Sequence, residues 1–195
     1  MLRLLPVLHF QGPILICVAV RDAKDRPILL VGMMGSGKST VGPTLARLLA
    51  RDFVDLDDEI ERRAGRTIAQ IFESDGEAAF RSLEREAVEA LARGDTVVAL
   101  GGGAIAEPGA PERLAKLGTV VYLRASPDSL MRRLGSAAER PLLSGLDEAG
   151  QRRRLEEILK ARQTAYETAQ VVVETNGRNV EEIARGIVED LGSVS

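Results

Sequence analysis

Residues 28–40 read Ile-Leu-Leu-Val-Gly-Met-Met-Gly-Ser-Gly-Lys-Ser-Thr, and this stretch decides the fold. A short apolar run ends at Gly32, and the residues from there to Ser39 satisfy the pattern G-x-x-x-x-G-K-[ST] at every fixed position. Helical periodicity begins near Ser39. A strand, a glycine-rich loop and a helix in this order are typical of a phosphate-binding loop. The stretch therefore predicts an α/β domain that binds a nucleoside triphosphate, ATP with magnesium.

Six residues of this loop are expected to bind ATP: Gly35, Ser36, Gly37, Lys38, Ser39 and Thr40. The Lys38 side chain should reach the β- and γ-phosphates, and the Ser39 hydroxyl should coordinate Mg²⁺. The loop alone does not separate a kinase from a GTPase or a motor protein.

Composition narrows the chemistry that the chain can perform. The chain has 195 residues, 45% of them apolar and 28% charged, with a net charge of −3, as expected for a globular domain without a nucleic-acid or membrane partner. Its one cysteine, Cys17, and one histidine, His9, exclude an internal disulfide, histidine-based catalysis and the usual zinc sites. The reaction must therefore use carboxylates, arginines, a lysine and a metal held by oxygen ligands.

Residues 28–195 are expected to form one domain, preceded by an extension over residues 1–27. The extension is apolar but interrupted by Pro6 and Pro13, and it is too short to span a bilayer. We expect it to be either an added strand over Ile14–Val20 or a disordered leader, and we expect a cytoplasmic protein.

Short apolar runs alternate with helical patterns from residue 28 onward, which predicts parallel strands with crossover helices. The predicted strands are 28–31, 53–56, 97–100, 120–123 and 171–173. Helices are predicted from Ser39, over 58–63 and 67–73, over 76–93 with Asp75 as N-cap, over 112–117, after Ser126-Pro127, over 151–168, and after Asn179. Residues 135–150 have the composition of a loop, and we expect a lid there. The fold class is therefore a three-layer α/β/α sandwich with a five-stranded parallel sheet.

A small-molecule kinase fits the remaining features better than a GTPase. The fourth strand is followed by Leu123-Arg124-Ala125-Ser126 where a GTPase would have N-K-x-D, and a triple glycine replaces the D-x-x-G switch. Asp55 and Asp57 follow the second strand, two residues apart, so both carboxylates can face one site. One suits magnesium through water, and the other can orient or deprotonate an acceptor hydroxyl.

Arginines and glycines supply the rest of the candidate acceptor site. Arg81 stands beside Phe80 and three residues before Glu84, which can hold its guanidinium group in place. Residues 101–103 are all glycine, so a ligand can approach the backbone closely. Arg140 lies in the expected lid, and Arg162 lies with Tyr166 on the following helix.

These features together resemble the shikimate kinase family. The similar segments run from Ile28 to about Leu191 and include GMMGSGKST, DLD, IFESDGEAAFRSLE, VVALGGGAI, RPLL and RQTAYETA. The resemblance implies a fold like that of the nucleoside monophosphate kinases, with a mobile lid. It also implies transfer of the ATP γ-phosphoryl group to the 3-hydroxyl of shikimate, in chorismate and aromatic amino acid biosynthesis.

The resemblance also implies a role for each site residue. Lys38, Asp57 and Arg140 would be catalytic, with Asp57 as the base and Arg140 moving from the lid onto the phosphates. Asp55 would hold magnesium through water beside Ser39. The shikimate site would comprise Asp57, Arg81, Gly102, Gly103, Arg162, Phe72 and Phe80. The adenine would be held by Arg133 and the loop around Asn176.

Two alternatives stay open from the residues. One is a related kinase of another hydroxy acid such as gluconate, and the other is a degenerate ATP-binding regulator. Family members often have proline shortly after the second carboxylate-binding arginine, where this chain has Gln163-Thr164-Ala165. The expected partners are shikimate and ATP, with no nucleic acid and no membrane, and the expected state is a monomer.

Overall fold

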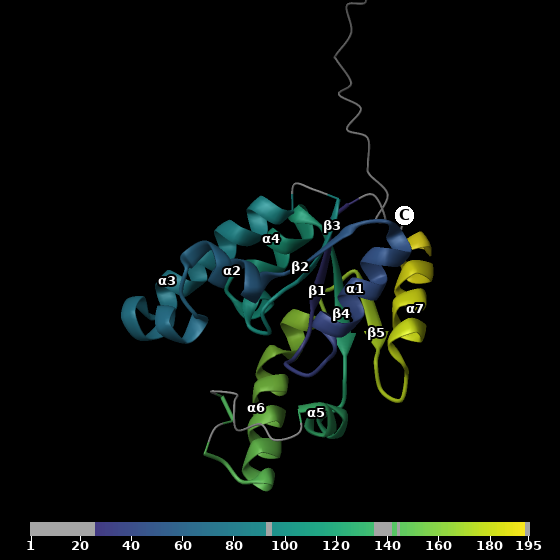
Figure 1. The fold of residues 1–195 in the computed structure, drawn as a ribbon. Helices are drawn as coiled ribbons and strands as arrows, with labels where there is room; N and C mark the ends of the chain where they lie inside the picture. The colour runs from purple at the N-terminus through teal and green to yellow at the C-terminus, as the bar shows by residue number, and fades with distance from the viewer. Residues whose placement is uncertain (1–25, 93–94, 135–141, 144, 194–195) are drawn as a thin grey trace, which may run out of the picture.

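Five parallel strands form one sheet in the order β2-β3-β1-β4-β5 in the computed structural model, which describes residues 26–92, 95–134, 142–143 and 145–193 (Figure 1). The strands are β1 (Ile28–Val31), β2 (Asp52–Asp55), β3 (Thr96–Ala99), β4 (Thr119–Arg124) and β5 (Val171–Glu174). All five predicted strands are present, each within one residue of its predicted bounds.

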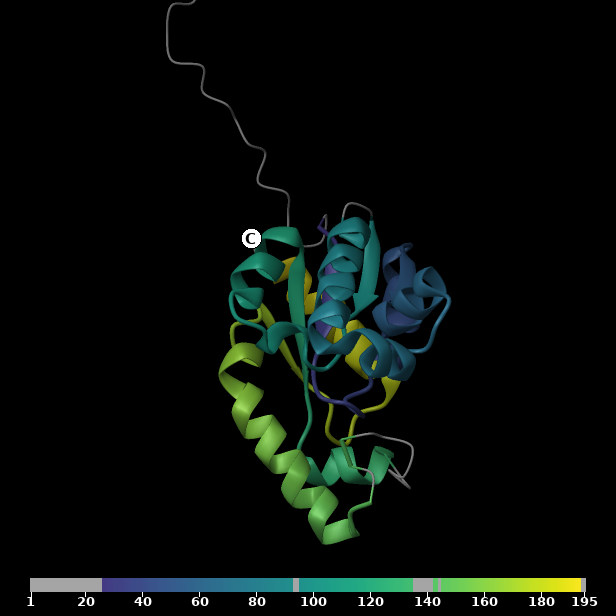
Figure 2. The ribbon, with the colours of Figure 1, turned by 90° about the vertical axis from the view of Figure 1, so that its left-hand side faces the viewer.

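Helices connect the strands and cover both faces of the sheet. They are α1 (Lys38–Leu49), α2 (Leu56–Ala64), α3 (Ile68–Leu91), the short 3₁₀ helix η2 (Ala104–Ala106), α4 (Ala110–Leu117), α5 (Pro127–Leu134), α6 (Glu148–Tyr166) and α7 (Val180–Ser193). In Figures 1 and 2, α1 and α7 lie on one face of the sheet and α3 and α4 on the other, while α5 and α6 project beyond it.

Strand β1 shows why the sheet is covered on both sides. All four of its residues are buried, and they alternate between two cores. Leu29 and Val31 face the core under α2, α3, α4 and α6, whereas Ile28 and Leu30 face the core under α1 and α7. A central parallel strand buried on both faces needs a continuous apolar sequence, as this one has. The predicted α/β fold is confirmed.

Two predicted helix boundaries are wrong for local reasons. Helix α3 contains both helices that were predicted, over 67–73 and over 76–93. The break between them falls at Gly76, whose φ of 83° lies in the left-handed region. Asp75 does not start a helix; its carboxylate instead pairs with Arg66 at 2.6 Å. Helix α6 begins three residues early because Asp147 caps it, accepting a hydrogen bond from the Gly150 N–H at 2.7 Å.

Several expectations fall outside the described residues. These are the added strand over Ile14–Val20, half of the expected lid (residues 135–141 and 144), and Arg140. Across the described ranges, no helix is both long enough and apolar enough to cross a membrane.

Candidate active site

The phosphate-binding loop lies at the carboxyl end of β1, between that strand and α1. Gly37 is the N-cap of α1 and has φ of 103°, a left-handed conformation that glycine adopts without strain. The Lys38 ammonium folds back over the loop and donates hydrogen bonds to the Gly32 carbonyl at 2.8 Å and the Met33 carbonyl at 3.1 Å. The lysine charge and the N-terminus of α1 therefore lie at the same point, where an anion is stabilised.

Asp55 and Asp57 lie beside this loop, but the strand alternation predicted for them is not what brings them there. Strand β2 ends at Asp55, and Asp57 belongs to the first turn of α2. Asp55 caps this helix, accepting from the Asp57 N–H at 3.2 Å, and also accepts from the Ser39 hydroxyl at 2.6 Å. The two carboxylates thus reach one site because a helix starts there.

The Asp57 carboxyl group is a stronger proton acceptor than an ordinary aspartate. Burial raises its pKa, and the negative charge of Asp55 raises it further, against the opposing effect of Lys38. A carboxylate with a raised pKa beside a substrate cavity is the arrangement expected of a general base.

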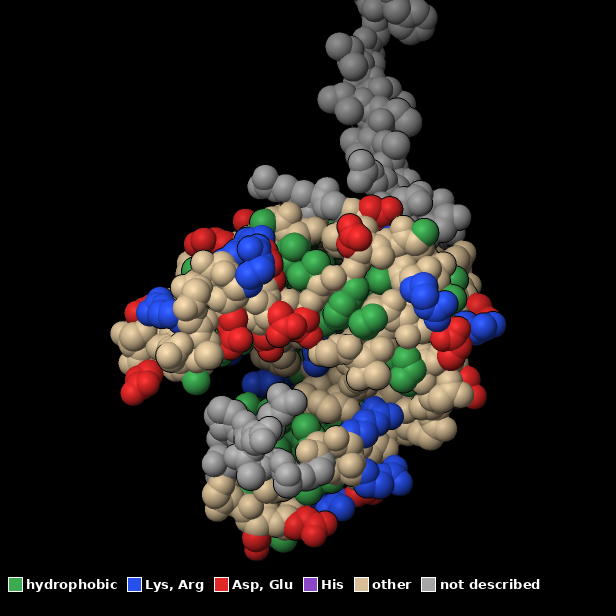
Figure 3. Space-filling model, viewed as in Figure 1, with side chains coloured by type: hydrophobic (Ala, Val, Ile, Leu, Met, Phe, Trp, Pro, Cys, Tyr) green, Lys and Arg blue, Asp and Glu red, His purple; other side chains and the backbone are tan. Residues whose placement is uncertain are grey.

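A cavity of about 860 Å³ extends from the phosphate-binding loop toward α3. Figure 3 shows a hollow between the lobe that carries α6 and the body of the domain, with basic side chains inside and acidic side chains above it. The lining residues are Met34, Asp57, Ile68, Ala69, Phe72, Glu73, Glu77, Phe80, Arg81, Glu84, Gly101, Gly102, Gly103, Leu142 and Arg162. All seven residues predicted for the acceptor side are among them.

Arg81 and Arg162 meet at Gly103. A side-chain methyl built on Gly103 would lie 3.0 Å from one terminal nitrogen of Arg81 and 3.5 Å from one of Arg162. The missing side chain of Gly103 therefore leaves a space between two guanidinium groups. Planar guanidinium groups bind carboxylates through paired hydrogen bonds, so this space suits a carboxylate.

Acidic side chains hold Arg81 in position. Glu84 accepts a hydrogen bond from it at 2.8 Å, and Glu77 and Glu107 lie at 3.3 and 3.4 Å. Glu84 is only 3% exposed, and burial raises its pKa even though the positive charge of Arg81 acts in the opposite direction. The predicted Arg81–Glu84 ion pair is confirmed, and Glu84 is the most buried of the three carboxylates around Arg81.

Two aromatic rings form the apolar wall of the cavity. The Phe72 and Phe80 ring centroids are 4.8 Å apart, and the Arg81 guanidinium lies 5.3 Å from the Phe80 centroid. Phe72 is 38% exposed. A flat apolar surface next to a carboxylate site suits a ring that carries a carboxylate.

Arg133 and Asn176, predicted to hold the adenine, lie at the other side of the phosphate-binding loop. Arg133 donates to the Ser36 carbonyl at 3.2 Å and to the Thr175 hydroxyl at 2.9 Å. Asn176 accepts from the Ser126 N–H at 3.0 Å. Arg133 thus connects the phosphate-binding loop with the loop after β5.

Sequence reasoning missed Glu77 and Glu107 as partners of Arg81. Glu77 precedes Arg81 by four helical residues, so its spacing could have revealed it. Glu107 follows the glycine-rich turn and has no local signal. Glu107 lies next to Arg81 only because the segment after η2 packs near α3 in the folded domain.

Comparison with known proteins identifies the family to which a chain with this site is similar. The profile of the family described as "Shikimate kinase" matches residues 34–192. The shikimate kinase of Chlorobium chlorochromatii (strain CaD3) is 46% identical over 170 residues, which cover 82% of this chain and 90% of that protein. The solved structure of shikimate kinase from Acinetobacter baumannii, in complex with shikimate, is 39% identical with a TM-score of 0.78, covering 86% of this chain and 93% of that one.

A more distant structural likeness bears on the gluconate alternative. A gluconokinase from Sinorhizobium meliloti 1021 has a TM-score of 0.55 at 20% identity, covering 87% of this chain and 93% of that one, which is a likeness of fold alone. The family profile spans most of the chain, and relatives well above 30% identity cover more than two thirds of it. The chain belongs to the shikimate kinase family.

Proposed function

We propose that this chain transfers the γ-phosphoryl group of ATP to the 3-hydroxyl of shikimate, giving shikimate 3-phosphate for chorismate and aromatic amino acid biosynthesis. The observation that carries the proposal is the pair of guanidinium groups, Arg81 and Arg162, that flank Gly103 in the cavity. Shikimate has a carboxylate for these arginines, hydroxyls for Asp57, and a ring for the Phe72 and Phe80 surface.

Coupled measurement of ADP release, with and without shikimate, tests this proposal directly. Shikimate is expected to stimulate ADP release strongly. An ADP release rate that shikimate leaves unchanged would reject it.

On the donor side, Gly35, Ser36, Gly37 and Thr40 would surround the phosphates with backbone and hydroxyl donors, while Lys38 offsets the charge on the transferred group. Arg140, which lies outside the described residues, would approach the phosphates from the lid. Arg133 and Asn176 would hold the adenine.

Magnesium is the metal that this reaction implies, and the donors present fit it. The Ser39 hydroxyl and the Asp55 carboxylate are oxygen donors 2.6 Å apart beside the phosphate-binding loop. Magnesium in kinases takes one or two protein oxygens, together with phosphate and water oxygens. Ser39 would bind it directly and Asp55 through water, and the bound ion would offset negative charge on the phosphates.

On the acceptor side, Asp57 would accept the hydroxyl proton as the oxygen attacks phosphorus. Arg81 and Arg162 would fix the carboxylate and thereby the direction of that hydroxyl. Binding in one orientation removes most of the entropic cost of bringing acceptor and donor together. Gly102 and Gly103 would let the ring approach the backbone.

A kinase of an open-chain acid such as gluconate remains the second candidate. The aromatic wall of Phe72 and Phe80 favours a cyclic acceptor, because a flexible polyol chain gains little from a flat apolar surface. A panel of hydroxy acids with ATP distinguishes the two. We further propose that the enzyme acts as a cytoplasmic monomer, with ATP and shikimate as its partners and neither nucleic acid nor membrane.

Gly103→Ala is expected to raise the KM for shikimate roughly tenfold or more, by filling the space between the two guanidinium groups. Gly103 has φ of −98°, so alanine adds a methyl group without backbone strain. Gly192→Ala is the matched control, since nothing lies within 4 Å of its added methyl. Steady-state kinetics in both substrates would measure this. Equal KM values in the two variants would contradict a carboxylate site at Gly103.

Asp58→Asn is expected to move the acid limb of the pH profile of kcat/KM to lower pH. The base must be ionised, so activity falls as pH drops through the pKa of Asp57. Burial contributes most to raising that pKa, and the exposed Asp58 adds to it, so removing the Asp58 charge lowers it. Asp52→Asn, at the far end of β2, is the control and should leave the limb in place. An unmoved limb in the Asp58 variant would argue against Asp57 as the base.

A further inference from the structure

The carbonyl oxygen of Gly102 accepts two hydrogen bonds from α6. The Tyr166 hydroxyl donates to it at 2.6 Å, and one terminal nitrogen of Arg162 donates to it at 2.9 Å. Both donors lie on the last turn or so of the same helix, four residues apart. The glycine-rich turn is therefore tied to α6 at one backbone atom.

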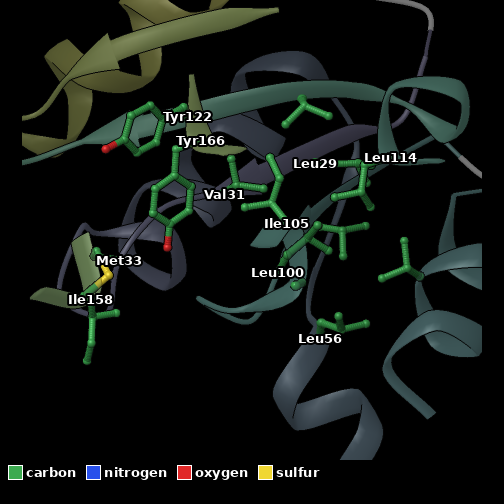
Figure 4. Close-up of a cluster of buried hydrophobic side chains, with 14 of the residues drawn as sticks. Leu29, Val31, Met33, Leu56, Leu100, Ile105, Leu114, Tyr122, Ile158 and Tyr166 are labelled. Carbon is green, nitrogen blue, oxygen red and sulfur yellow. The ribbon is translucent and has the colours of Figure 1, made fainter. Parts of the chain in front are cut away.

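The surroundings of Tyr166 restrict the position of its hydroxyl group, and therefore of the Gly102 carbonyl oxygen that the hydroxyl contacts. Its side chain is completely buried, and its ring stacks on Tyr122 with the centroids 4.8 Å apart and an interplanar angle of 8°. Figure 4 shows the two rings side by side, with their hydroxyl groups pointing in different directions. The stack leaves the Tyr166 hydroxyl little freedom to move away from Gly102, because a buried ring between packed neighbours has few alternative positions.

Gly102 lies between the donor and acceptor parts of the site. A methyl built on it would be 3.5 Å from the Gly32 carbonyl and 3.6 Å from the Met34 N–H nitrogen, so this residue borders the phosphate-binding loop. The next residue, Gly103, lies between the Arg81 and Arg162 guanidinium groups. A shift of the Gly102 peptide would therefore change the distance from the carboxylate site to the phosphates.

The orientation of the Arg162 guanidinium group depends on the same Gly102 carbonyl oxygen. One of its terminal nitrogens is used on the Gly102 carbonyl, and another lies 3.5 Å from a methyl built on Gly103. With the carbonyl fixed, the guanidinium group presents its remaining N–H donors toward the space beside Gly103. The Tyr166 hydroxyl therefore acts on Arg162 through this shared acceptor as well as by its direct interaction with the guanidinium group.

We propose that Tyr166 is a positioning residue for the acceptor, which fixes the Gly102 carbonyl and with it the Arg162 side of the carboxylate site. This inference rests on the proposed function of the site. It adds a residue that lines no part of the cavity and does not touch the substrate.

Tyr166→Phe tests the inference, because it removes one oxygen atom and keeps the stacked ring. The KM for shikimate is expected to rise about five- to tenfold, the scale of one lost hydrogen bond, while the KM for ATP stays within about twofold. Tyr122→Phe is the matched control: it changes the other ring of the same stack, whose hydroxyl does not reach Gly102, and should leave both KM values near wild type. Circular dichroism and Tm check that both variants fold.

The effect of Tyr166 should also depend on Arg162. In an Arg162→Lys background, the added effect of Tyr166→Phe on the KM for shikimate is expected to be much smaller. The reason is that lysine lacks the guanidinium group, which donates to the Gly102 carbonyl alongside Tyr166. Full additivity of the two changes would overturn the inference.

The outcomes separate this inference from the function on which it rests. A lowered Tm with both KM values unchanged in Tyr166→Phe would show a purely structural role and overturn it. Equal increases in the KM values for shikimate and ATP would also overturn it. If wild-type ADP release does not respond to shikimate, the proposed function itself fails, and the inference fails with it.

Discussion

Asp57→Asn is expected to lower kcat for shikimate by roughly 10²-fold or more, the usual scale for removing an acid–base group. Asparagine has the same size as aspartate but does not accept the hydroxyl proton. The local structure should persist, because Asp55 caps α2 through the backbone N–H of residue 57, which asparagine retains. ATP binding should change little, since the hydrogen bonds of Lys38 and Ser39 go to backbone carbonyls and to Asp55 rather than to this side chain.

The same substitution is expected to leave the protein at least as stable as the wild type. The pKa of Asp57 is raised in the folded state, chiefly by burial, so the ionised carboxylate destabilises the fold at neutral pH relative to the unfolded chain. A neutral side chain removes that cost. Catalytic residues often carry such a trade between activity and stability.

Coupled ADP release gives kcat, calorimetric titration gives the ATP affinity, and thermal unfolding gives Tm. Asp58→Asn is the control, because it makes the same chemical change one residue away on an exposed side chain. Its kcat at neutral pH should stay near wild type. Near-normal turnover in Asp57→Asn would remove Asp57 from the role of base.

Arg81→Ala is expected to raise the KM for shikimate by roughly 10²-fold, while the KM for ATP changes little. Hydrogen bonds to a charged partner contribute about 1.5–3 kcal/mol, and a planar guanidinium group can make two of them to one carboxylate. Arg81 pairs with Glu77, Glu84 and Glu107, which lie outside the phosphate-binding loop, so its loss should affect ATP binding little.

Loss of Arg81 also leaves Glu84 buried without its partner at 2.8 Å, which should lower Tm. The double variant Arg81→Ala/Glu84→Gln separates the two effects. Removing the buried charge should restore much of the stability but none of the affinity for shikimate. Recovery of the KM together with the Tm would mean that Arg81 acts only through folding.

The parts of this molecule that sequence could predict are those with local causes. An apolar run followed by a fixed glycine and lysine pattern specifies β1, the loop and the start of α1 within a dozen residues. The Arg81–Glu84 pair has helical spacing, so it too could be predicted. In each case the contacting groups are close along the chain, and backbone geometry alone brings them together.

Strand alternation, on which the Asp55–Asp57 prediction was based, is not what positions these two residues. Alternation along a strand would put both side chains on one face, but β2 ends at Asp55 and a helix takes over. An aspartate with three acidic residues among the next four, here at 57–59, also favours a helix N-terminus, since acidic groups stabilise the first turn. Whether residues 55–57 continue the strand or begin a helix could not be decided from these few residues.

Long-range contacts remained beyond sequence reasoning. The Tyr166 hydroxyl and the Gly102 carbonyl are 64 residues apart, and their meeting depends on how α6 packs against the glycine-rich turn. Glu107 reaches Arg81 in the same way. Such contacts follow from the packing of whole elements and have no signature in the residues themselves.

Helix α6 is anchored near its C-terminal end and projects from the body of the domain (Figures 1 and 2). It has 19 residues and is therefore about 28 Å long. A rotation of the helix by about 10° about the Gly102 carbonyl would carry its Glu148 end through about 4 Å. Helix α5, which packs along it, would turn with it. A small rotation at the carboxylate site would therefore give a larger displacement at the far end, where residues 145–147 lead into α6.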